Sequence, residues 1–270
     1  MTPELLSVVR AALPAGRMIR SDEGNGEVRA LWMSDGPTKA GLWAQLYGDH
    51  RRTGVWPLLL DSRDPHDGEF RPWGAGELFP ERMSSPEAHD AAELLGRWWR
   101  SYTSVDDEED VLSPADRLAV TAPFGRVWPG PAPALRPTAD PMATAVDYAR
   151  HFLARRPHSR LGLVAAGSGA HALAAVGWDG PVNYANDTAE FAAVVADWEE
   201  RFGARVVGVG SATLHLSVAA PPTTATEALL VAAEHFAFCP DNIWQNHHPH
   251  TVAAYAGRLI GCHGWDFWWD

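Results

Sequence analysis

Residues 105–141 form the part of the chain that most constrains its fold. Five prolines stand between positions 123 and 137, and proline neither continues a helix interior nor pairs within a central strand. An uninterrupted acidic run, 106–110, precedes them; such a run repels itself and favours solvent, with contact to a cation or a partner as the alternative. The sequence therefore predicts a Pro-rich, semi-rigid connector at 111–140 between two domains, residues 1–110 and 141–270.

Both flanking regions carry the patterns of folded structure. Alternating or continuous apolar residues predict strands at 17–20, 27–33, 55–60, 161–164, 206–209, 214–218 and 264–270. Apolar residues at helical spacing predict helices at 42–47, 86–100, 144–154, 168–176, 187–202, 226–238 and 251–260, after a short helix that starts at Thr2-Pro3. Pro57 favours an edge position, or the start of a strand, for 55–60.

This mixture of elements predicts the fold class. Two strands that meet at Gly210-Ser211 form an antiparallel hairpin, whereas other strands alternate with helices. We expect an α+β protein with a mixed, partly antiparallel sheet, packed helices and two subdomains. The composition, 46% apolar and 21% charged over 270 residues, is that of a globular protein and excludes wholesale disorder.

The charge balance excludes one class of partner. The formal net charge is −12, and a general nucleic-acid binder needs a cationic face. The longest aliphatic run, 55–60, is too short to cross a bilayer, and the first fourteen residues lack the basic segment of a secretory signal. Cys239 and Cys262 do not amount to a disulfide framework. We therefore expect a cytoplasmic protein without nucleic-acid or membrane partners.

Four stretches near the carboxyl end carry a family resemblance. They are 205–210 (RVVGVG), 214–218 (LHLSV), 233–243 (AEHFAFCPDNI) and 265–270 (WDFWWD). With them, the region from about residue 160 to the end resembles the bacterial, mostly actinobacterial, family called domain of unknown function 4253. The resemblance implies a soluble domain and assigns no activity. An arginine-dominated set of basic residues, with Lys39 as the single lysine, also indicates a GC-rich bacterial genome.

A first group of candidates would carry catalysis. Glu234, His235 and Cys239 lie near the end of a helix that we expect to be buried, with His235 and Cys239 on one face. An imidazolium there would lower the pKa of the thiol and create a nucleophile. The negative end of the helix dipole opposes this, and free cysteine usually packs as a small hydrophobe. His215 and Asp241 complete the catalytic candidates.

A second group would bind a ligand. Asp241 and Asn242 follow Pro240 in a turn sequence. Their side chains either bond to nearby backbone or, beside Trp244 and Gln245, present polar groups to a ligand.

The terminal strand adds Trp268 to the ligand-binding candidates. Strand alternation places Trp265, Phe267 and Trp269 on a face that fills the core, and Trp268 opposite, between two acids. An exposed tryptophan marks a recognition surface, and packing is the alternative.

Two sets of histidines are further candidates for function. His215 stands between two leucines and faces away from them, so we expect it at the surface or in a cleft, either as a satisfied histidine or as a base or ligand residue. His247, His248 and His250, with His263 downstream, can chelate, but they lie in a Pro-containing loop without an HExxH helix. We predict no metal and no cofactor.

Two glycine motifs fail their context. Gly208-Val209-Gly210 precedes a strand rather than a helix, so it is not a dinucleotide fingerprint. Gly167-Ser168-Gly169 joins a strand to a helix like a nucleophile elbow, but lacks glycines two residues either side of the serine. Backbone amides there can hold an anion, and turn chemistry is the simpler explanation.

Two functional classes remain. The first is a non-catalytic binding or regulatory protein, of the immunity type, that engages a protein partner or a small polar ligand. Acidity, thirteen tryptophans and the absence of a complete catalytic motif favour it. The second is a hydrolase or transferase that uses His215, Glu234, His235, Cys239 and Asp241.

Overall fold

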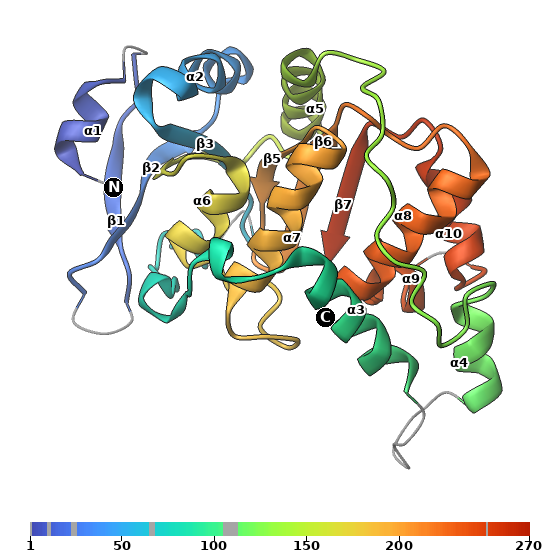
Figure 1. Ribbon diagram of the computed structural model, residues 1–270. Coiled ribbons are helices and arrows are strands. Elements are labelled where there is room, and N and C mark those ends of the chain that lie inside the picture. The colour runs from blue at the N-terminus through green and yellow to red at the C-terminus, as the bar shows by residue number, and fades with distance from the viewer. Residues whose placement is uncertain (1, 10–11, 23–25, 65–67, 105–112, 247) are drawn as a thin grey trace.

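The computed structural model describes residues 2–9, 12–22, 26–64, 68–104, 113–246 and 248–270 (Figure 1). Within them, one sheet holds seven strands in the order β1-β2-β4-β3-β5-β6-β7. The strands are β1 (Gly16–Arg20), β2 (Arg29–Pro37), β3 (Val55–Leu60), β4 (Arg160–Ala165), β5 (Ala204–Val209), β6 (Thr213–Val218) and β7 (Gly264–Trp268). Neighbours are antiparallel except β3 and β5, which run parallel. The predicted α+β class with a mixed sheet is confirmed.

Helices cover both faces of this sheet (Figure 1). The described helices are α1 (Pro3–Ser7), α2 (Ala40–Thr53), α3 (Ala91–Thr103), α4 (Pro114–Val120), α5 (Pro141–Arg155), α6 (Gly169–Val176), α7 (Thr188–Arg201), α8 (Ala225–Phe238), α9 (Asp241–Trp244) and α10 (Val252–Leu259), with single turns η1 (Pro80–Arg82) and η2 (Pro86–Ala88). α2 and α5 pack on one face, and α6, α7 and α8 pack on the other. No helix in the described ranges is long and apolar enough to span a membrane.

The sheet continues across the predicted domain boundary. β4 follows the Pro-rich stretch, yet it lies between β2 and β3, which precede that stretch. Buried residues from both halves belong to one hydrophobic cluster. The division into domains 1–110 and 141–270 stays a prediction, and a fragment experiment in the Discussion addresses it.

The Pro-rich stretch is held against the helices by its own backbone. After α4, the Ala132 N–H donates to the Glu234 carboxylate at 2.6 Å, and the Leu135 N–H donates to the Arg201 carbonyl at 3.0 Å. The Thr138 N–H then reaches the Ala219 carbonyl at 2.9 Å. The acidic run 106–110 lies outside the described residues.

β3 departs from its predicted place. It lies inside the sheet, between β4 and β5, so the expectation that Pro57 marks an edge or a strand start is wrong. The recorded pairing of β3 with β5 involves Leu59 and Leu60, so Pro57 lies outside that part of the ladder. Beside it, the Trp56 indole donates to the Val206 carbonyl at 3.1 Å, which satisfies backbone that a neighbouring strand would otherwise pair. The Trp56 side chain thus supplies a hydrogen bond where strand pairing is absent, which explains how proline is tolerated inside the sheet.

Helix α3 begins later than its apolar spacing predicts. We expected it from residue 86, but the first turn there is η2, and α3 starts after Asp90, whose carboxylate accepts the Glu93 N–H at 2.9 Å. The cap therefore sets the boundary. This short irregular segment places Glu87 beside α6.

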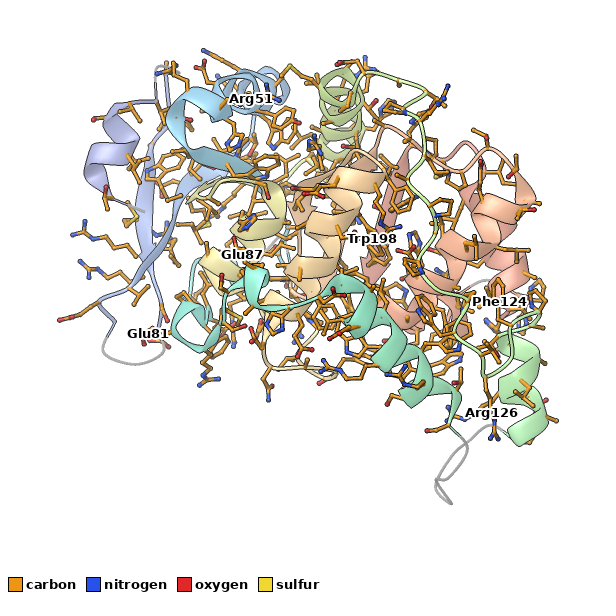
Figure 2. All side chains as sticks on the ribbon, in the orientation of Figure 1. Arg51, Glu81, Glu87, Phe124, Arg126 and Trp198 are labelled. Atoms are coloured by element: carbon orange, nitrogen blue, oxygen red, sulfur yellow. The ribbon has the colours of Figure 1, made fainter. Side chains whose placement is uncertain are left out.

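Tryptophan fills the interior. Trp43, Trp73, Trp99, Trp178, Trp198 and Trp265 are fully buried. In β7 and just beyond it, Trp265, Phe267 and Trp269 are buried while Trp268 is partly exposed, as strand alternation predicts. Figure 2 shows Trp198 within the helical layer that covers this end of the sheet.

Candidate functional site

Glu234 joins three parts of the chain. Its buried carboxylate accepts the Trp198 indole N–H at 2.6 Å and two guanidinium N–H groups of Arg201 at 2.7 and 2.9 Å. It also accepts the Ala132 N–H. Ion pairing and hydrogen bonding offset the desolvation of the charge, and the network ties α7, α8 and the Pro-rich stretch together. This predicted catalytic acid is engaged within the fold.

The neighbouring pair, His235 and Cys239, lies in the dry interior. The His235 ring is buried among aromatic rings, 4.5 Å from Trp265 and 4.8 Å from Phe267 between centroids, and burial lowers its pKa to about 3. The Cys239 Sγ lies 2.9 Å from the Trp268 carbonyl, and burial raises the pKa of the thiol. At neutral pH the imidazole is uncharged and the thiol protonated, which is what the packing alternative predicts for Cys239.

His215 is buried, contrary to prediction. Only 3% of it is exposed, because α5 covers the face of β6 to which it points and brings the Phe152 ring within 5.0 Å. Its Nδ1 lies 2.8 Å from the Asp266 Oδ1, and the Tyr148 hydroxyl donates to the same oxygen. Burial raises the pKa of Asp266, but these hydrogen bonds outweigh it and hold the pKa below its ordinary value.

Asp241 and Asn242 are buried and hold the terminal strand. Asp241 accepts the Tyr184 hydroxyl at 2.8 Å and the Asp270 N–H at 3.1 Å. The Asn242 amide donates to the Asp266 carbonyl at 2.7 Å and accepts the Trp268 N–H at 3.3 Å. Their polar atoms therefore position β7 and the two residues that follow it.

The remaining predicted ligand residues lie around α9. Trp244 is partly buried against Tyr102 and beneath the Arg117 guanidinium, and Gln245 is exposed with its amide on Asp241. Trp268 contributes backbone groups to Cys239 and Asn242. The structure thus gathers the predicted ligand residues around one corner, where they bond mostly to one another and to β7.

The described histidines of this loop do not converge on one point. His250 Nδ1 lies 3.1 Å from the Ile243 carbonyl, and His263 Nδ1 lies 2.7 Å from the Val218 carbonyl, whereas His248 is exposed. Over the described ranges, no group of three or more His, Cys, Asp or Glu side chains is placed to hold a metal ion. His247 falls outside these ranges.

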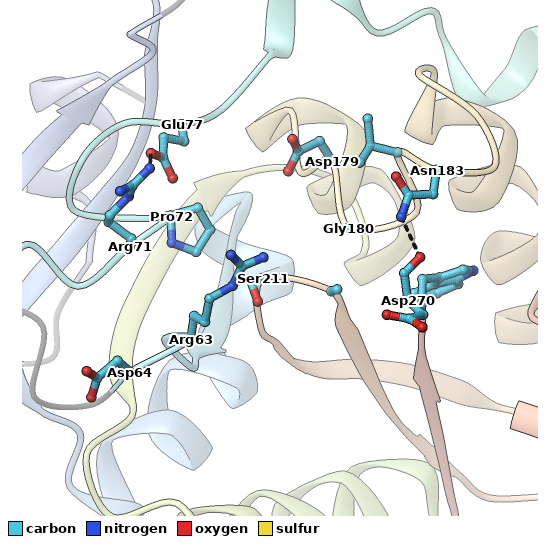
Figure 3. Close-up of a pocket in the computed structure, with 13 residues that line it drawn as sticks. Arg63, Asp64, Arg71, Pro72, Glu77, Asp179, Gly180, Asn183, Ser211 and Asp270 are labelled. Atoms are coloured by element: carbon cyan, nitrogen blue, oxygen red, sulfur yellow. Dashed lines mark hydrogen bonds and ion pairs between the residues drawn. The ribbon is translucent and has the colours of Figure 1, made fainter. Parts of the chain in front are cut away.

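A cavity of about 720 Å³ opens at the carboxyl ends of β3 and β5 (Figure 3). Because parallel strands end at the same edge of a sheet, the loops that follow them enclose a crevice suited to ligands. The walls consist of residues 63–64, 71–72, 77, 179–180, 182–183, 211–212 and 269–270. None of the predicted catalytic or ligand-binding residues, all of which are described, is among them.

Two indoles fix the loops at this edge. The Trp73 indole donates to the Asp61 carbonyl just after β3, at 2.7 Å, and the Trp178 indole donates to the Gly210 carbonyl just after β5, at 2.8 Å. The Trp269 N–H bonds to the Ala212 carbonyl at 3.0 Å, which sets the terminal residues against the β5–β6 turn. Buried aromatic residues therefore position a polar rim.

Opposite charges face each other in this cavity. In Figure 3, Arg63 extends toward Ser211, while Asp179 and Asp270 lie across from it on other segments. Arg71 is paired with Glu77, but within the described residues no side chain neutralises the Arg63 guanidinium. Burial raises the pKa of Asp179, so its charge is poorly solvated.

Sequence reasoning missed this site although a signal was present. Asp61-Ser62-Arg63-Asp64 follows the wholly buried strand β3 directly, and Ser211 comes two residues after the largely buried strand β5. Polar residues at the ends of buried strands are candidates for binding, but only if those ends meet. The parallel pairing of β3 and β5, about 150 residues apart in the chain, is what brings them together, and periodicity does not reveal it.

Comparison with protein families finds a match for the C-terminal part of the chain. No curated protein and no solved structure matches the chain. The family match begins at β4 and includes Asp179, Ser211 and Asp270, but not Arg63 or Arg71. It confirms the resemblance carried by the hairpin, helix and terminal-strand residues: residues 160–270 match the family described as Domain of unknown function (DUF4253).

Proposed function

We propose that the protein binds a small zwitterionic ligand, of the α-amino acid or short peptide class, in the cavity at the carboxyl ends of β3 and β5. The observation that carries the proposal is the opposition of Arg63 to Asp179 and Asp270 across one cavity. Arg63 binds the carboxylate of the ligand, and the two acids bind its ammonium group. The proposal belongs to the binding class that the acidity of the chain and the lack of a complete catalytic motif favour. It specifies the small polar ligand as a zwitterion.

Arg63 is suited to a carboxylate. A guanidinium presents parallel N–H groups that match the two oxygens of a carboxylate, and such charge-assisted pairs are stronger than neutral hydrogen bonds. The Ser211 hydroxyl lies on the same side of the cavity and offers a further donor. Asp64 lies next to Arg63 in the chain, at the rim rather than among the opposed acids.

Asp179 is suited to an ammonium group. Its raised pKa means that the ionised form is destabilised in the free protein. A bound cation within a few ångströms restores part of the lost solvation through Coulomb attraction. Asp270 is held in place for the same task, because Asp241 accepts its N–H and the Asn183 amide donates to its carbonyl.

The catalytic alternative has less support. Glu234, His235 and Cys239 are buried, and none of them lines this cavity. Asp241 acts on the site only by positioning Asp270. A regulatory role and a protein partner stay predictions. Ligand binding would provide a physical basis for either of them.

Thermal unfolding with each free L-amino acid tests the proposal. A ligand at a hundredfold excess over its Kd stabilises the folded protein by about 2.7 kcal/mol, which is a readily measured rise in Tm. We expect at least one amino acid to raise Tm, and acetate or ethylamine alone to raise it less. Calorimetry then gives the Kd for each variant.

Two variants and two controls make the test specific. Arg63→Gln and Asp179→Asn should each weaken binding roughly tenfold to a hundredfold, the range of a lost charged hydrogen bond. Arg150→Gln and Asp147→Asn, an exposed ion pair on α5, should leave it unchanged. Absence of any shift with all amino acids, or equal binding by Arg63→Gln and wild type, would contradict the proposal.

A further inference from the structure

Three side chains form a hydrogen-bonded line at the opposite end of the sheet. Ser168 Oγ lies 2.9 Å from His171 Nδ1, and His171 Nε2 lies 2.6 Å from Glu87 Oε1. Nucleophile, base and orienting acid in this order are the parts of a serine hydrolase site. Here the ring nitrogens exchange roles relative to the usual triad, because Nδ1 faces the serine.

Local structure explains the contact between serine and histidine. Ser168 is the N-cap of α6, separated from β4 by Ala166 and Gly167, and its Oγ accepts the His171 N–H at 3.4 Å. Cap and third helical residue lie on the same side of the first turn, so the imidazole reaches the hydroxyl.

Glu87 reaches the histidine from a distant segment. It belongs to η2, which packs beside α7, and the Ser84 N–H anchors this segment to Asp187 at 3.1 Å. Figure 2 shows Glu87 in front of α6. Hydrogen bonds from Ser85, from its own N–H and from His171 lower the pKa of Glu87 to about 2. The ionised carboxylate accepts the Nε2–H, which leaves Nδ1 free to accept the Ser168 proton.

Ser168 and His171 open into a second cavity, of about 650 Å³. Trp56, Pro141 and Met142 give it an apolar side. Glu199 gives it a polar one: its carboxylate accepts the Ala170 N–H at 3.1 Å, and burial raises its pKa. The nearby Ser168 side chain partly offsets this rise in the Glu199 pKa, and the same hydroxyl lies within hydrogen-bond distance of His171 Nδ1.

We infer that Ser168 is the nucleophile of an esterase site for small carboxylic esters, with His171 as general base and Glu87 as the residue that positions it. The site lies at the amino ends of β3 and β5, away from the proposed ligand cavity, and does not depend on it.

The reaction balances with water as the second substrate. Ser168 Oγ attacks the ester carbonyl while its proton passes to His171 Nδ1, and Glu87 stabilises the imidazolium. The C–O bond to the alcohol breaks, and the alcohol leaves with the proton from Nδ1. A water molecule, deprotonated by Nδ1, then attacks the acyl-serine, which releases the carboxylic acid and returns the proton to Ser168.

A fluorophosphonate probe tests the nucleophile on the full-length protein. The Ser168 oxygen displaces fluoride and forms a stable phosphonyl ester, which mass spectrometry locates. We expect an adduct on Ser168 and hydrolysis of p-nitrophenyl acetate above the buffer rate. His171→Gln should slow both by about a hundredfold or more, the usual contribution of a general base.

Controls separate catalysis from helix capping. Ser168→Asp keeps a side-chain cap acceptor but removes the nucleophile, so it should retain the wild-type Tm and lose activity. Ser113→Ala removes the equivalent cap of α4 and should leave activity unchanged. Glu87→Gln should lower kcat for p-nitrophenyl acetate without changing KM, whereas a merely structural role would leave kcat unchanged. No adduct on Ser168, or equal labelling of His171→Gln and wild type, overturns the inference.

Discussion

Polar side chains at the end of α8 differ in their environment from those at the edge of the sheet beyond β3 and β5. At α8, Glu234 has a full set of partners, and His235 and Cys239 are uncharged among aromatic rings. At the sheet edge, Arg63 has no neutralising side chain within the described residues, and Asp179 carries a poorly solvated charge. Titratable side chains whose hydrogen-bond partners lie in the dry interior therefore stabilise the fold. Charged side chains that line a cavity without an ion-pair partner are instead candidates for binding a ligand.

Separating the halves of the chain should have the largest effect. A fragment of residues 141–270 loses β2 and β3, the two neighbours of β4, so we expect it not to fold. Circular dichroism and heteronuclear NMR of the fragment provide the measurement. A folded fragment with dispersed signals would instead support the two-domain division.

Removing the Glu234 carboxylate should be the most damaging single change. Glu234→Ala leaves Asp197 as the one carboxylate paired with the Arg201 guanidinium among the described residues, and breaking a buried pair costs about 3–5 kcal/mol. Urea denaturation measures the loss. Asp147→Ala, which breaks an exposed pair, serves as the control and should change little. Equal effects of the two changes would mean that the Glu234 network does not stabilise the fold.

The two thiols should differ in reactivity. Cys239 is buried with a raised pKa, while Cys262 is partly exposed. Native-state alkylation should therefore modify Cys262 roughly a hundredfold or more faster, and Cys239 only as the protein opens. A Cys239 that reacts quickly in the native protein would restore the thiol as a candidate nucleophile.

Asp179→Asn should have the smallest effect on stability, and this effect should be a gain rather than a loss. The folded-state pKa of Asp179 is raised, so its contribution to stability is full below its ordinary pKa and is lost as pH rises through the raised value. At neutral pH the asparagine variant should thus be more stable, by less than about 1 kcal/mol because solvent screens a partly exposed group. It should nevertheless bind amino acids more weakly. A variant that loses stability and keeps binding would contradict the role assigned to this acid.

Much of the fold is predictable from periodicity, but the site is not. The β5–β6 hairpin, α8 and the alternation of Trp265, Phe267 and Trp269 follow from patterns within a few residues of one another. The burial of His215 and the interior place of Pro57 depend on α5 and on the Trp56 indole, which are tertiary contacts. The binding cavity depends on strand pairing between distant segments, so its residues could be recognised only in the structure.

An NMR titration of the tryptophan indole N–H signals compares both regions in one measurement. Trp269 lines the binding cavity and the Trp178 indole is bonded to the Gly210 carbonyl next to it, whereas the Trp198 indole is bonded to Glu234 of α8. On addition of the amino acid that raises Tm most, we predict that the Trp178 and Trp269 signals shift with one common Kd and that the Trp198 signal stays. Movement of Trp198 while Trp178 and Trp269 remain fixed would place the ligand at the interior cluster and contradict the account.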